Sequence, residues 1–382
     1  MLDVRRMSKG KVLHISKFYP PYKGGIEDVC YSIVNSMDGY EHRVLCFNTG
    51  KETVDEMYDG VPVLRVGVQM QRYSQPIAFA YHKALKKELE TFQPDIIHLH
   101  TPNPFASFLV CRYIKRHVKL VVHWHSDIIK QKFTYKAYKP FESKLLKRAD
   151  AIFATSPNYA EHSLPLKPYK DKVKIVPNGI NEEKIAPKEG DQEKIDQIRD
   201  KYQGKKIIFF MGRHVSYKGI DRLIDAEKKI KSDCVILIAG DGSLTNELKA
   251  STKSERIHFI GKICDEEIRL YMRAASVFAF PSITKNEAFG IVLAEAMYCA
   301  TPPVLFSIEG SGVNWLNQNG VTGLEVANSD TTAFASAIDK LLLNDNNLRE
   351  EMGENAHKRI AENFTMARIK TIIDKEYEAL IH

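Results

Sequence analysis

The sequence predicts an α/β protein made of two Rossmann-like halves, and three observations support this fold class. At 382 residues the chain exceeds the size that one hydrophobic core usually organises, so we expect two domains. In both halves, apolar strand-like runs alternate with helix-like segments, a pattern typical of parallel sheets covered by helices. Between the halves, residues 177–204 carry many charges and no strand signal. We therefore place the hinge and the first helix of the second domain there.

The first half alternates in chain order. Its apolar runs predict strands at Lys11–Ser16, His42–Asn48, Val61–Val66, Asp95–His100, Lys119–Trp124, Asp150–Thr155 and Val173–Val176. Amphipathic spacing predicts helices at Glu27–Met37, Ile77–Phe92 and Phe105–His117, and in the basic segment after Trp124.

The second half restarts the alternation after Gly204. Strands are predicted at Lys206–Met211, Cys234–Ala239, Ile257–Ile260, Ala275–Phe280 and Pro303–Phe306, with helices between them. One of these helices is expected at Ile291–Met297, and the chain becomes mostly helical after Gly323.

Composition indicates a soluble, cytoplasmic protein. The chain is 44% hydrophobic and 27% charged, and no apolar run approaches the roughly 20 residues of a membrane span. Residues 1–10 lack the apolar region of a secretory signal. The six cysteines form no CxxC pair, so we interpret them as thiols in a reducing compartment.

Residues 128–148 hold nearly all of the net charge of +7, with seven basic residues against one acid, and aromatic residues interleave with them. Lysines with aromatics suit an anionic membrane surface, which would make the protein peripheral on the inner face of the cell membrane. An ordinary solvated helix face remains the alternative. We find no nucleic-acid-binding motif and expect no nucleic acid partner. The basic residues are Lys130, Lys132, Lys136, Lys139, Lys144, Lys147 and Arg148.

Residues 281–296 place a carboxylate between a strand and a helix start. Glu287 precedes Ala288-Phe289-Gly290, and helical spacing begins at Ile291. In an α/β domain a ligand binds beyond the carboxyl ends of strands, and the free N–H groups of a helix start favour an anion. A second acid, Glu295, lies about two turns along. The alternative is an ordinary strand–helix unit with acids on its surface.

Two further loops carry candidate ligand-binding residues. Arg213 and Lys218 lie five residues apart between a strand and a helix, where both could reach a diphosphate. Gly24 and Gly25 close the first strand–helix loop and would allow close approach to a phosphate or a sugar. A plain surface loop and a plain tight turn remain open. A third glycine-containing loop, residues 239–243, is not GxGxxG, so the dinucleotide signal is weak.

Two His-X-His pairs, His98/His100 and His123/His125, end two predicted strands, and alternation puts each pair on one face. Four imidazoles could hold zinc, but neither an acid nor a cysteine accompanies them at metal spacing. We therefore expect no metal site, with His98 and His123 structural and His125 directed into a cleft. No Asp-X-Asp pair occurs, so fixed cations and a helix N-terminus would have to neutralise a bound diphosphate.

Together, these stretches resemble the retaining family-four glycosyltransferases of the GT-B fold. The matching segments follow the family order and span nearly the whole chain. They are Tyr-Pro-Pro-Tyr-Lys-Gly-Gly-Ile-Glu (19–27), His-Trp-His-Ser-Asp (123–127), Val-Pro-Asn-Gly-Ile (176–180), Gly-Arg-His-Val-Ser-Tyr-Lys-Gly (212–219), Ala-Gly-Asp-Gly (239–242), Glu-Ala-Phe-Gly-Ile-Val-Leu-Ala-Glu (287–295) and Asn-Gly-Val-Thr-Gly-Leu (319–324).

The resemblance implies two Rossmann-like domains facing across a cleft, with a C-terminal helix crossing back to the first. Residues 1–180 would bind the acceptor, 181–364 the nucleotide sugar, and 365–382 would form that helix. No cofactor or metal is implied. A hexose would pass from a GDP- or UDP-linked donor to a saccharide or polyprenyl-linked acceptor, with retention.

The resemblance also implies residue roles. Arg213 and Lys218 would bind the donor diphosphate, and Glu287 would hold the sugar. His125 would reach the sugar from the other domain, and Glu295 would bind the ribose. The remaining donor-binding positions would be Gly24, Gly25, Ala288, Phe289, Gly290 and Ile291.

The sequence departs from the family pattern at two places. Ala300-Thr301-Pro302-Pro303 stands where the family often has Gly before Pro, and Gly-Ser-Gly-Val (310–313) stands where many members have Gly-Gly and an acid. These departures bear on donor identity. Alternative functions are a catalytically inactive sugar-nucleotide-binding membrane scaffold, a GT-B epimerase, or a phosphorylase, for which no cofactor-lysine context is found.

Overall fold

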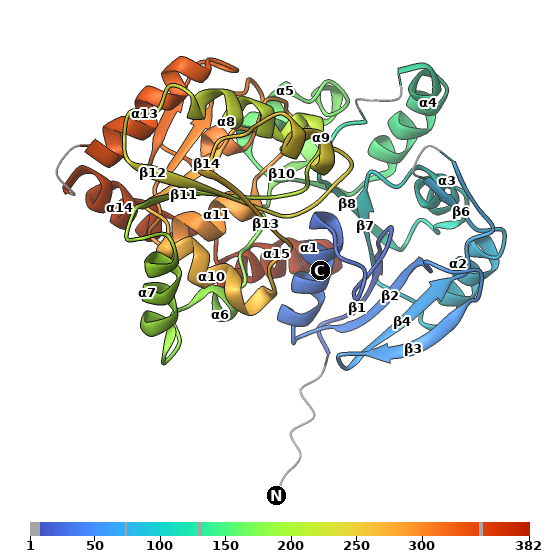
Figure 1. The fold of residues 1–382 in the computed structure, drawn as a ribbon. Helices are drawn as coiled ribbons and strands as arrows, with labels where there is room; N and C mark the ends of the chain where they lie inside the picture. The colour runs from blue at the N-terminus through green and yellow to red at the C-terminus, as the bar shows by residue number, and fades with distance from the viewer. Residues whose placement is uncertain (1–7, 73–74, 129–131, 344–346) are drawn as a thin grey trace, which may run out of the picture. The chain divides into compact units, whose positions relative to one another are not determined.

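The computed structural model describes residues 8–72, 75–128, 132–343 and 347–382. The chain divides into two compact units (Figure 1). The N-terminal unit comprises Met1–Gly179 and Met366–His382, and the C-terminal unit comprises Ile180–Thr365. The roles of acceptor binding and nucleotide-sugar binding that we assign to the two domains stay predictions.

The N-terminal unit is built on an eight-stranded sheet with the order β10-β9-β8-β7-β1-β2-β4-β3. All pairs are parallel except β3 with β4, and β5 pairs with β6 as a separate antiparallel ribbon. The strands are β1 (Lys11–Ile15), β2 (Glu41–Phe47), β3 (Val54–Tyr58), β4 (Val61–Val66), β5 (Met70–Arg72), β6 (Gln75–Ile77), β7 (Ile96–Thr101), β8 (Lys119–Trp124), β9 (Ala151–Ala154) and β10 (Val173–Ile175).

Six α-helices and one 3-10 helix cover this sheet within the described residues. They are α1 (Gly25–Ser36), α2 (Tyr81–Thr91), α3 (Pro104–Tyr113), α4 (Lys132–Arg148), α5 (Pro157–His162), η1 (Lys167–Lys172) and the terminal helix α15 (Met366–Ile381).

Helix α15 packs on the N-terminal unit although it ends the chain. It buries Ile369, Ile373 and Tyr377, and apolar burial of this kind is worth roughly 1.5–3 kcal/mol per large side chain. At its surface, Lys9 pairs with Asp374 at 2.7 Å. A C-terminal helix that returns to the first domain is the arrangement expected of the fold class.

The C-terminal unit contains a six-stranded parallel sheet with the order β13-β12-β11-β14-β15-β16. Its strands are β11 (Lys206–Met211), β12 (Cys234–Ala239), β13 (Ile257–Gly261), β14 (Val277–Phe280), β15 (Pro303–Phe306) and β16 (Leu324–Val326). Its helices are α6 (Glu182–Ile185), α7 (Asp191–Lys201), η2 (Ser216–Lys218), α8 (Ile220–Glu227), α9 (Thr245–Ala250), α10 (Asp265–Ala274), α11 (Ile291–Tyr298), α12 (Val313–Leu316), α13 (Thr331–Leu343) and α14 (Asn347–Asn363).

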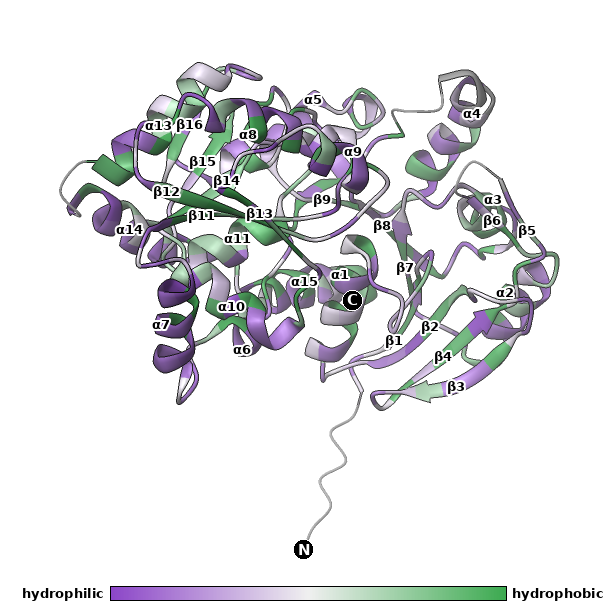
Figure 2. Ribbon diagram, viewed as in Figure 1, coloured by the Kyte–Doolittle hydropathy of each residue, from purple (hydrophilic) through white to green (hydrophobic). Residues whose placement is uncertain are grey.

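Both faces of this second sheet are apolar. Along β11, Ile207 and Phe209 join the core under α10, α11 and α14, whereas Ile208 and Phe210 join the core under α8 and α13. Strands buried on both faces read as continuous hydrophobic runs, and Figure 2 shows β11 and β12 strongly hydrophobic. These runs explain why β11, β12 and β15 were predicted at their observed bounds.

Each sheet has a point where the strand order reverses. In the C-terminal unit β11 lies between β12 and β14, so the loops after β11 and β14 leave the same edge side by side. In the N-terminal unit β1 lies between β2 and β7. Ligands of doubly wound sheets bind at such reversal points, beyond the carboxyl ends of the strands.

The two parallel α/β sheets confirm the predicted fold class, but several predicted bounds were wrong. The helix expected at Ile77–Phe92 begins only at Tyr81, because Ile77 ends strand β6, where it pairs with Met70 of β5. The strand expected from Ala275 begins at Val277, because the N–H of Ala275 still bonds the α10 carbonyl of Tyr271. Strands β3, β5, β6 and β16 were not predicted.

Candidate active site

The loops after β11 and β14 bring together Lys218 and Glu287. The Lys218 ammonium forms a salt bridge with the Glu287 carboxylate, and the two side chains are only 11% and 13% exposed. Lys218 Nζ also lies 5.3 Å from the centroid of the Phe280 ring. A nearly buried ion pair requires further polar contacts to offset its desolvation, and the surrounding loops supply them.

Lys218 is placed by a tight backbone contact. It ends η2, and Gly219 follows with φ +63°. A Cβ atom at Gly219 would lie 2.0 Å from the carbonyl oxygen of Pro281. Glycine is therefore needed both for the left-handed backbone and for the close approach of the β14 loop, and this approach keeps Lys218 beside Glu287.

Glu287 is oriented from two sides. The Ser282 hydroxyl lies 3.3 Å from Glu287 Oε2. The Ser311 hydroxyl donates to the Glu287 carbonyl oxygen, and the Gly312 N–H donates to the Ala288 carbonyl at 3.0 Å. The Gly-Ser-Gly departure from the family pattern thus has a structural role, because buried Ser311 anchors the loop that carries Glu287.

Helix α11 begins directly behind this carboxylate. Its N-cap, Gly290, has φ +86°, and no side-chain cap bond is found there in the described part of the chain. First-turn N–H groups have no intrahelical partner and carry the positive end of the helix dipole. Ala288 and Phe289 are buried just before the helix, and Ile291 opens it, half-buried. Half-buried Glu295 lies further along α11.

Arg213 is exposed in the loop that leads to Lys218, with its Nη2 3.5 Å from the Tyr217 hydroxyl. The backbone around it is held by the next loop, because the His214 N–H donates to the Asp241 carbonyl at 3.0 Å and the Leu244 N–H donates to the His214 carbonyl at 3.1 Å. The backbone is fixed while the guanidinium faces solvent. This arrangement leaves its N–H groups available to a ligand.

In the N-terminal unit, Gly24 and Gly25 start α1 after the β1 loop. A Cβ atom at Gly24 would lie 2.3 Å from Glu27 Oε2, whereas one at Gly25 would meet no described atom within 4 Å. In the described chain, therefore, only Gly24 has a close neighbour, and that neighbour is the end of the Glu27 side chain.

His125 follows β8 and is only 6% exposed. Its Nε2 lies 3.0 Å from His100 Nδ1, and its ring stacks on that of His123 at 4.1 Å between centroids. Burial lowers the pKa of His125 to about 3, so the imidazole is neutral at physiological pH. The predicted alternation holds, because His98, His100 and His123 contact one another on a single face of the sheet.

The structure groups the predicted residues by unit. Lys218, Glu287 and Gly290 share one edge of the C-terminal sheet, with Arg213 in the same loop as Lys218. Sequence reasoning did not single out Ser282 and Ser311, although Ser311 lay in a departure already noted. It identified His100 as half of a His-X-His pair but not its contact with His125.

Two family models match the chain. The model described as Glycosyltransferase Family 4 covers residues 23–184, and the model described as Glycosyl transferases group 1 covers residues 191–359. O-antigen chain mannosyltransferase C of Escherichia coli is 31% identical over 361 residues, with 93% of this chain and 94% of that protein covered. The chain is a family 4 glycosyltransferase. It is therefore an enzyme of a retaining sugar-transferase family.

Other comparisons agree with this family. D-rhamnosyltransferase WbpZ of Pseudomonas aeruginosa is 33% identical over 362 residues, with 93% of this chain and 92% of that protein covered. The crystal structure of Anabaena HepE with UDP and glucose has a TM-score of 0.78 at 20% identity, covering 97% of this chain and 100% of that chain. Sucrose-phosphate synthase from Thermosynechococcus elongatus also reaches 0.78 at 20% identity, with 97% and 98% covered. At such identity, the two structures show a shared fold.

Among the described helices, none combines the length and the apolar character needed to cross a bilayer. The predicted basic segment forms α4, although its residues 129–131, including Lys130, lie outside the described residues. Phe141 of α4 is 45% exposed, and its ring contacts that of Phe108, which is 47% exposed, edge-on. The lysines with described exposed side chains are Lys136, Lys139, Lys144 and Lys147.

Proposed function

We propose that this enzyme transfers a hexose from a GDP- or UDP-linked donor to a lipid-linked saccharide or polysaccharide acceptor, with retention and without a metal ion. The C-terminal unit would bind the donor and the N-terminal unit the acceptor. The observation that carries the proposal is the nearly buried Lys218–Glu287 pair before the N-terminus of α11, where the strand order of the sheet reverses. A sheet of this kind binds its ligand at that point.

The leaving diphosphate develops negative charge when the glycosyl–phosphate bond breaks. We assign its stabilisation to Lys218, Arg213 and the first-turn N–H groups of α11. An ammonium has three N–H donors, so Lys218 can hold Glu287 and a phosphate oxygen at once. Donors fixed in place before the reaction stabilise the transition state without reorganisation. Three such sources replace the charge that a metal ion would otherwise supply.

The transferred sugar develops oxocarbenium character, which a neighbouring carboxylate stabilises. We assign this role to Glu287, which Ser282 and Lys218 orient. His125, neutral at physiological pH, would donate or accept a hydrogen bond at the sugar. Glu295 would bind the ribose, and Gly24 and Gly25 would allow close approach of the substrate. Because no described atom lies near a Cβ at Gly25, that position suits a ligand contact.

The relatives favour a manno-configured sugar. One is named a mannosyltransferase and the other a D-rhamnosyltransferase, and D-rhamnose is the 6-deoxy form of D-mannose. The mannosyltransferase acts, by its name, on an O-antigen chain. We therefore place this enzyme in the assembly of a cell-surface polysaccharide, and expect a donor whose sugar has an axial hydroxyl at C2.

A donor panel tests the proposal. Purified enzyme is incubated with the GDP- and UDP-linked forms of mannose, rhamnose, glucose and galactose, with and without a polyprenyl-linked saccharide acceptor, and release of nucleoside diphosphate is measured. We expect acceptor-dependent release with a manno-configured donor, unchanged by EDTA. Release that disappears in EDTA and returns with magnesium would contradict metal independence. The absence of release with every donor would remove the proposed reaction.

We also propose that α4 attaches the enzyme to an anionic membrane surface. The exposed Phe108–Phe141 ring pair can insert among lipid headgroups, while the exposed lysines of α4 contact the acidic lipids. Each basic residue near such a surface contributes about 1 kcal/mol. A lipid-linked acceptor is presented at the same surface, so attachment would bring the enzyme to its substrate.

Vesicle sedimentation tests the attachment. We expect binding to vesicles with acidic phospholipid, weakened by salt, and weak binding to neutral vesicles. The variant K136E/K139E/K144E should partition less, whereas a matched triple variant of exposed lysines in the C-terminal unit, K201E/K228E/K249E, should partition like the wild type. Equal partition of the two triple variants would contradict a specific role for α4.

A further inference from the structure

A layer of buried histidines crosses the sheet of the N-terminal unit. All but the half-buried His42 are at most 6% exposed, and burial lowers the pKa of each one. They are therefore neutral rings at physiological pH, and each neutral ring has one nitrogen that can accept or ligate. The six are His14, His42, His98, His100, His123 and His125.

Two groups in this layer have a composition and spacing suited to a metal ion, and hydrogen bonding distinguishes them. In the group His98, His100 and His123, both nitrogens of His98 are already engaged, one by Tyr377 and the other by His123 at 3.1 Å. In the group His14, Cys30 and His100, the nitrogens His14 Nδ1 and His100 Nε2 are buried and have no hydrogen-bond partner among the described residues. His123 Nε2 is also buried without a described partner, but the engaged nitrogens of His98 leave the first group without a third ligand atom. The second group offers two vacant nitrogens and a thiol.

The tautomer of His14 follows from its neighbours. His42 Nε2 lies 2.9 Å from the carbonyl oxygen of Met37, which can only accept, so His42 Nε2 carries the proton. The other nitrogen of neutral His42 must then accept from His14 Nε2, 3.1 Å away. His14 Nδ1 is consequently left with a bare lone pair. A buried lone pair without a partner costs free energy unless something binds it.

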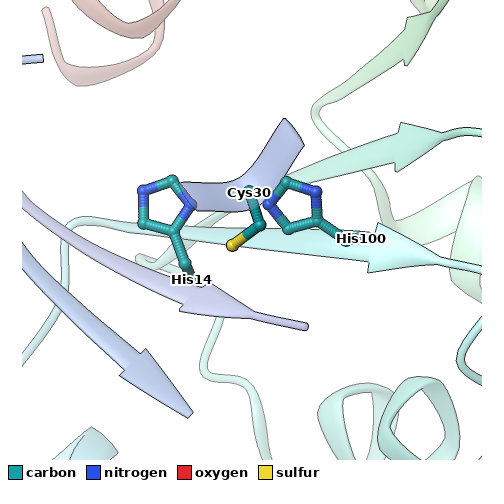
Figure 3. A group of neighbouring side chains, drawn as sticks. All are labelled: His14, Cys30 and His100. Carbon is teal, nitrogen blue, oxygen red and sulfur yellow. The ribbon is translucent and has the colours of Figure 1, made fainter. Parts of the chain in front are cut away.

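Cys30 approaches these atoms from the helix above the sheet. His14 comes from β1, His100 from β7 and Cys30 from α1, and Figure 3 shows the three side chains converging. Their ligand atoms lie within 4.8 Å of one another. We propose that His14 Nδ1, His100 Nε2 and the Cys30 sulfur bind one thiophilic metal ion, Zn²⁺ or Cu⁺, in the core of the N-terminal unit.

The chemistry of the three ligands fits such an ion. Imidazole and thiolate are the ligands that Zn²⁺ and Cu⁺ prefer. Bond lengths of about 2.0 Å to nitrogen and 2.3 Å to sulfur require these atoms to close in by only about an ångström. The neutral rings present no proton to displace, and the Cys30 thiol releases its proton to solvent as the metal–sulfur bond forms. Carboxylates and exposed groups are absent from the ligand set, which disfavours Mg²⁺ and Ca²⁺.

Metal binding would also fix the tautomer of the neighbouring ring. With Nε2 bound to metal, neutral His100 carries its proton on Nδ1 and donates to His125 Nε2, 3.0 Å away. Ligating histidines commonly use their second nitrogen in this way. The consequence for sugar binding rests on the proposed function of His125, but the metal site itself does not.

Metal content and metal spectroscopy of the full-length, untagged enzyme test the inference. Protein purified without chelator is analysed by mass spectrometry of the elements, before and after loading with one equivalent of Zn²⁺ or, under reducing conditions, Cu⁺. We expect about one equivalent of either ion to be retained through gel filtration. X-ray absorption of the loaded wild type should show sulfur and nitrogen ligands together. Loading with Co²⁺ in place of Zn²⁺ should produce a thiolate-to-cobalt charge-transfer band.

A cysteine pair supplies the matched variants. Cys30 and Cys46 are both fully buried in the same core, but only Cys30 belongs to the proposed site. Cys30→Ser should lose the cobalt band and most of the retained metal, whereas Cys46→Ser should keep both. If Cys30→Ser fails to fold, the X-ray absorption of the loaded wild type still tests the inference, because it shows directly whether sulfur binds the metal. No retained metal, or a ligand shell without sulfur, would overturn the inference, and neither result depends on transferase activity.

Discussion

The two units place their buried polar groups differently. In the N-terminal unit the sheet itself holds buried polar side chains, because β7 and β8 contribute His98, His100 and His123 to its interior. In the C-terminal unit the strands are apolar on both faces, and the nearly buried ion pairs lie outside the sheet: Lys218 with Glu287 beyond the strand ends, and Asp191 with Arg269 between α7 and α10.

This difference separates two ways of using a parallel sheet. The C-terminal unit uses an apolar framework to hold a charged pair at the edge where strand order reverses, which suits a charged ligand. The N-terminal unit keeps neutral rings inside, linked by hydrogen bonds, which suits positioning without net charge. We therefore expect substitutions at the charged edge of the C-terminal unit to change catalysis, and acid to destabilise the N-terminal sheet first.

The largest effect is expected at the charged edge of the C-terminal unit. Glu287→Gln should lower kcat about 100-fold or more, because it removes charge that acts mainly in the transition state. Glu295→Gln should raise the donor KM about tenfold with kcat nearly unchanged, because a ribose contact is equally strong in the ground state. Steady-state kinetics against the donor measure both. The opposite assignment of effects would mean that our placement of the sugar is wrong.

The second-largest effect is a loss of folding stability in acid, which we expect mainly in the N-terminal unit. Burial lowers the pKa of His98 and His125 to about 3, well below the unfolded value of 6.5. Between these values the unfolded chain binds more protons than the folded one, so stability is fully present above pH 6.5 and is lost as pH falls toward 3.

Hydrogen exchange resolved by segment, corrected for intrinsic rates, can follow both units between pH 7.5 and pH 5. We expect β7 and β8 to lose protection before β11 and β12, whose described interior contains no histidine. Equal loss of protection in the two sheets would contradict the expected difference between the two units.

A smaller effect, on stability, is expected from the close contact between the loops after β11 and β14. Gly219 and Gly190 both have positive φ, but only Gly219 meets backbone, since a Cβ at Gly190 would have no described atom within 4 Å. Gly190→Ala should cost about 1 kcal/mol of unfolding free energy for the backbone alone. Gly219→Ala should cost about 1–3 kcal/mol more, because the Pro281 loop must move. Equal costs in denaturant titrations would contradict the tight contact that places Lys218.

Much of the fold was predictable because its signals are local. The strands β8, β11, β12 and β15 were predicted at their observed bounds, since each is a continuous apolar run between polar turns. Strand β3 was missed because Val54–Tyr58 carries two acids and lies at the sheet edge, where one face meets solvent. Strand β6 was missed because its last residue, Ile77, was taken as the start of a helix.

The candidate site was less predictable, because its contacts depend on strand order. Nothing local in the loops after β11 and β14 indicates that they are neighbours, and only the family resemblance implied that Lys218 and Glu287 act together. The position of Cys30 could not be predicted from the sequence for the same reason. It lies in a predicted helix without metal-like spacing, and only the packing of α1 on β1 and β7 brings it to His14 and His100.

The central claim is that the donor binds at the charged edge of the C-terminal unit, and equilibrium binding of GDP and UDP tests it most directly. Lys218→Met can be compared with Lys206→Met, since Lys206 begins β11 and Lys218 lies in the loop after the same strand. A charged contact to phosphate is worth roughly 1.5–3 kcal/mol. Calorimetry should therefore show affinity for the preferred diphosphate falling by about 10- to 100-fold in Lys218→Met and unchanged in Lys206→Met. Unchanged affinity in Lys218→Met, or an equal loss in both variants, would contradict the claim.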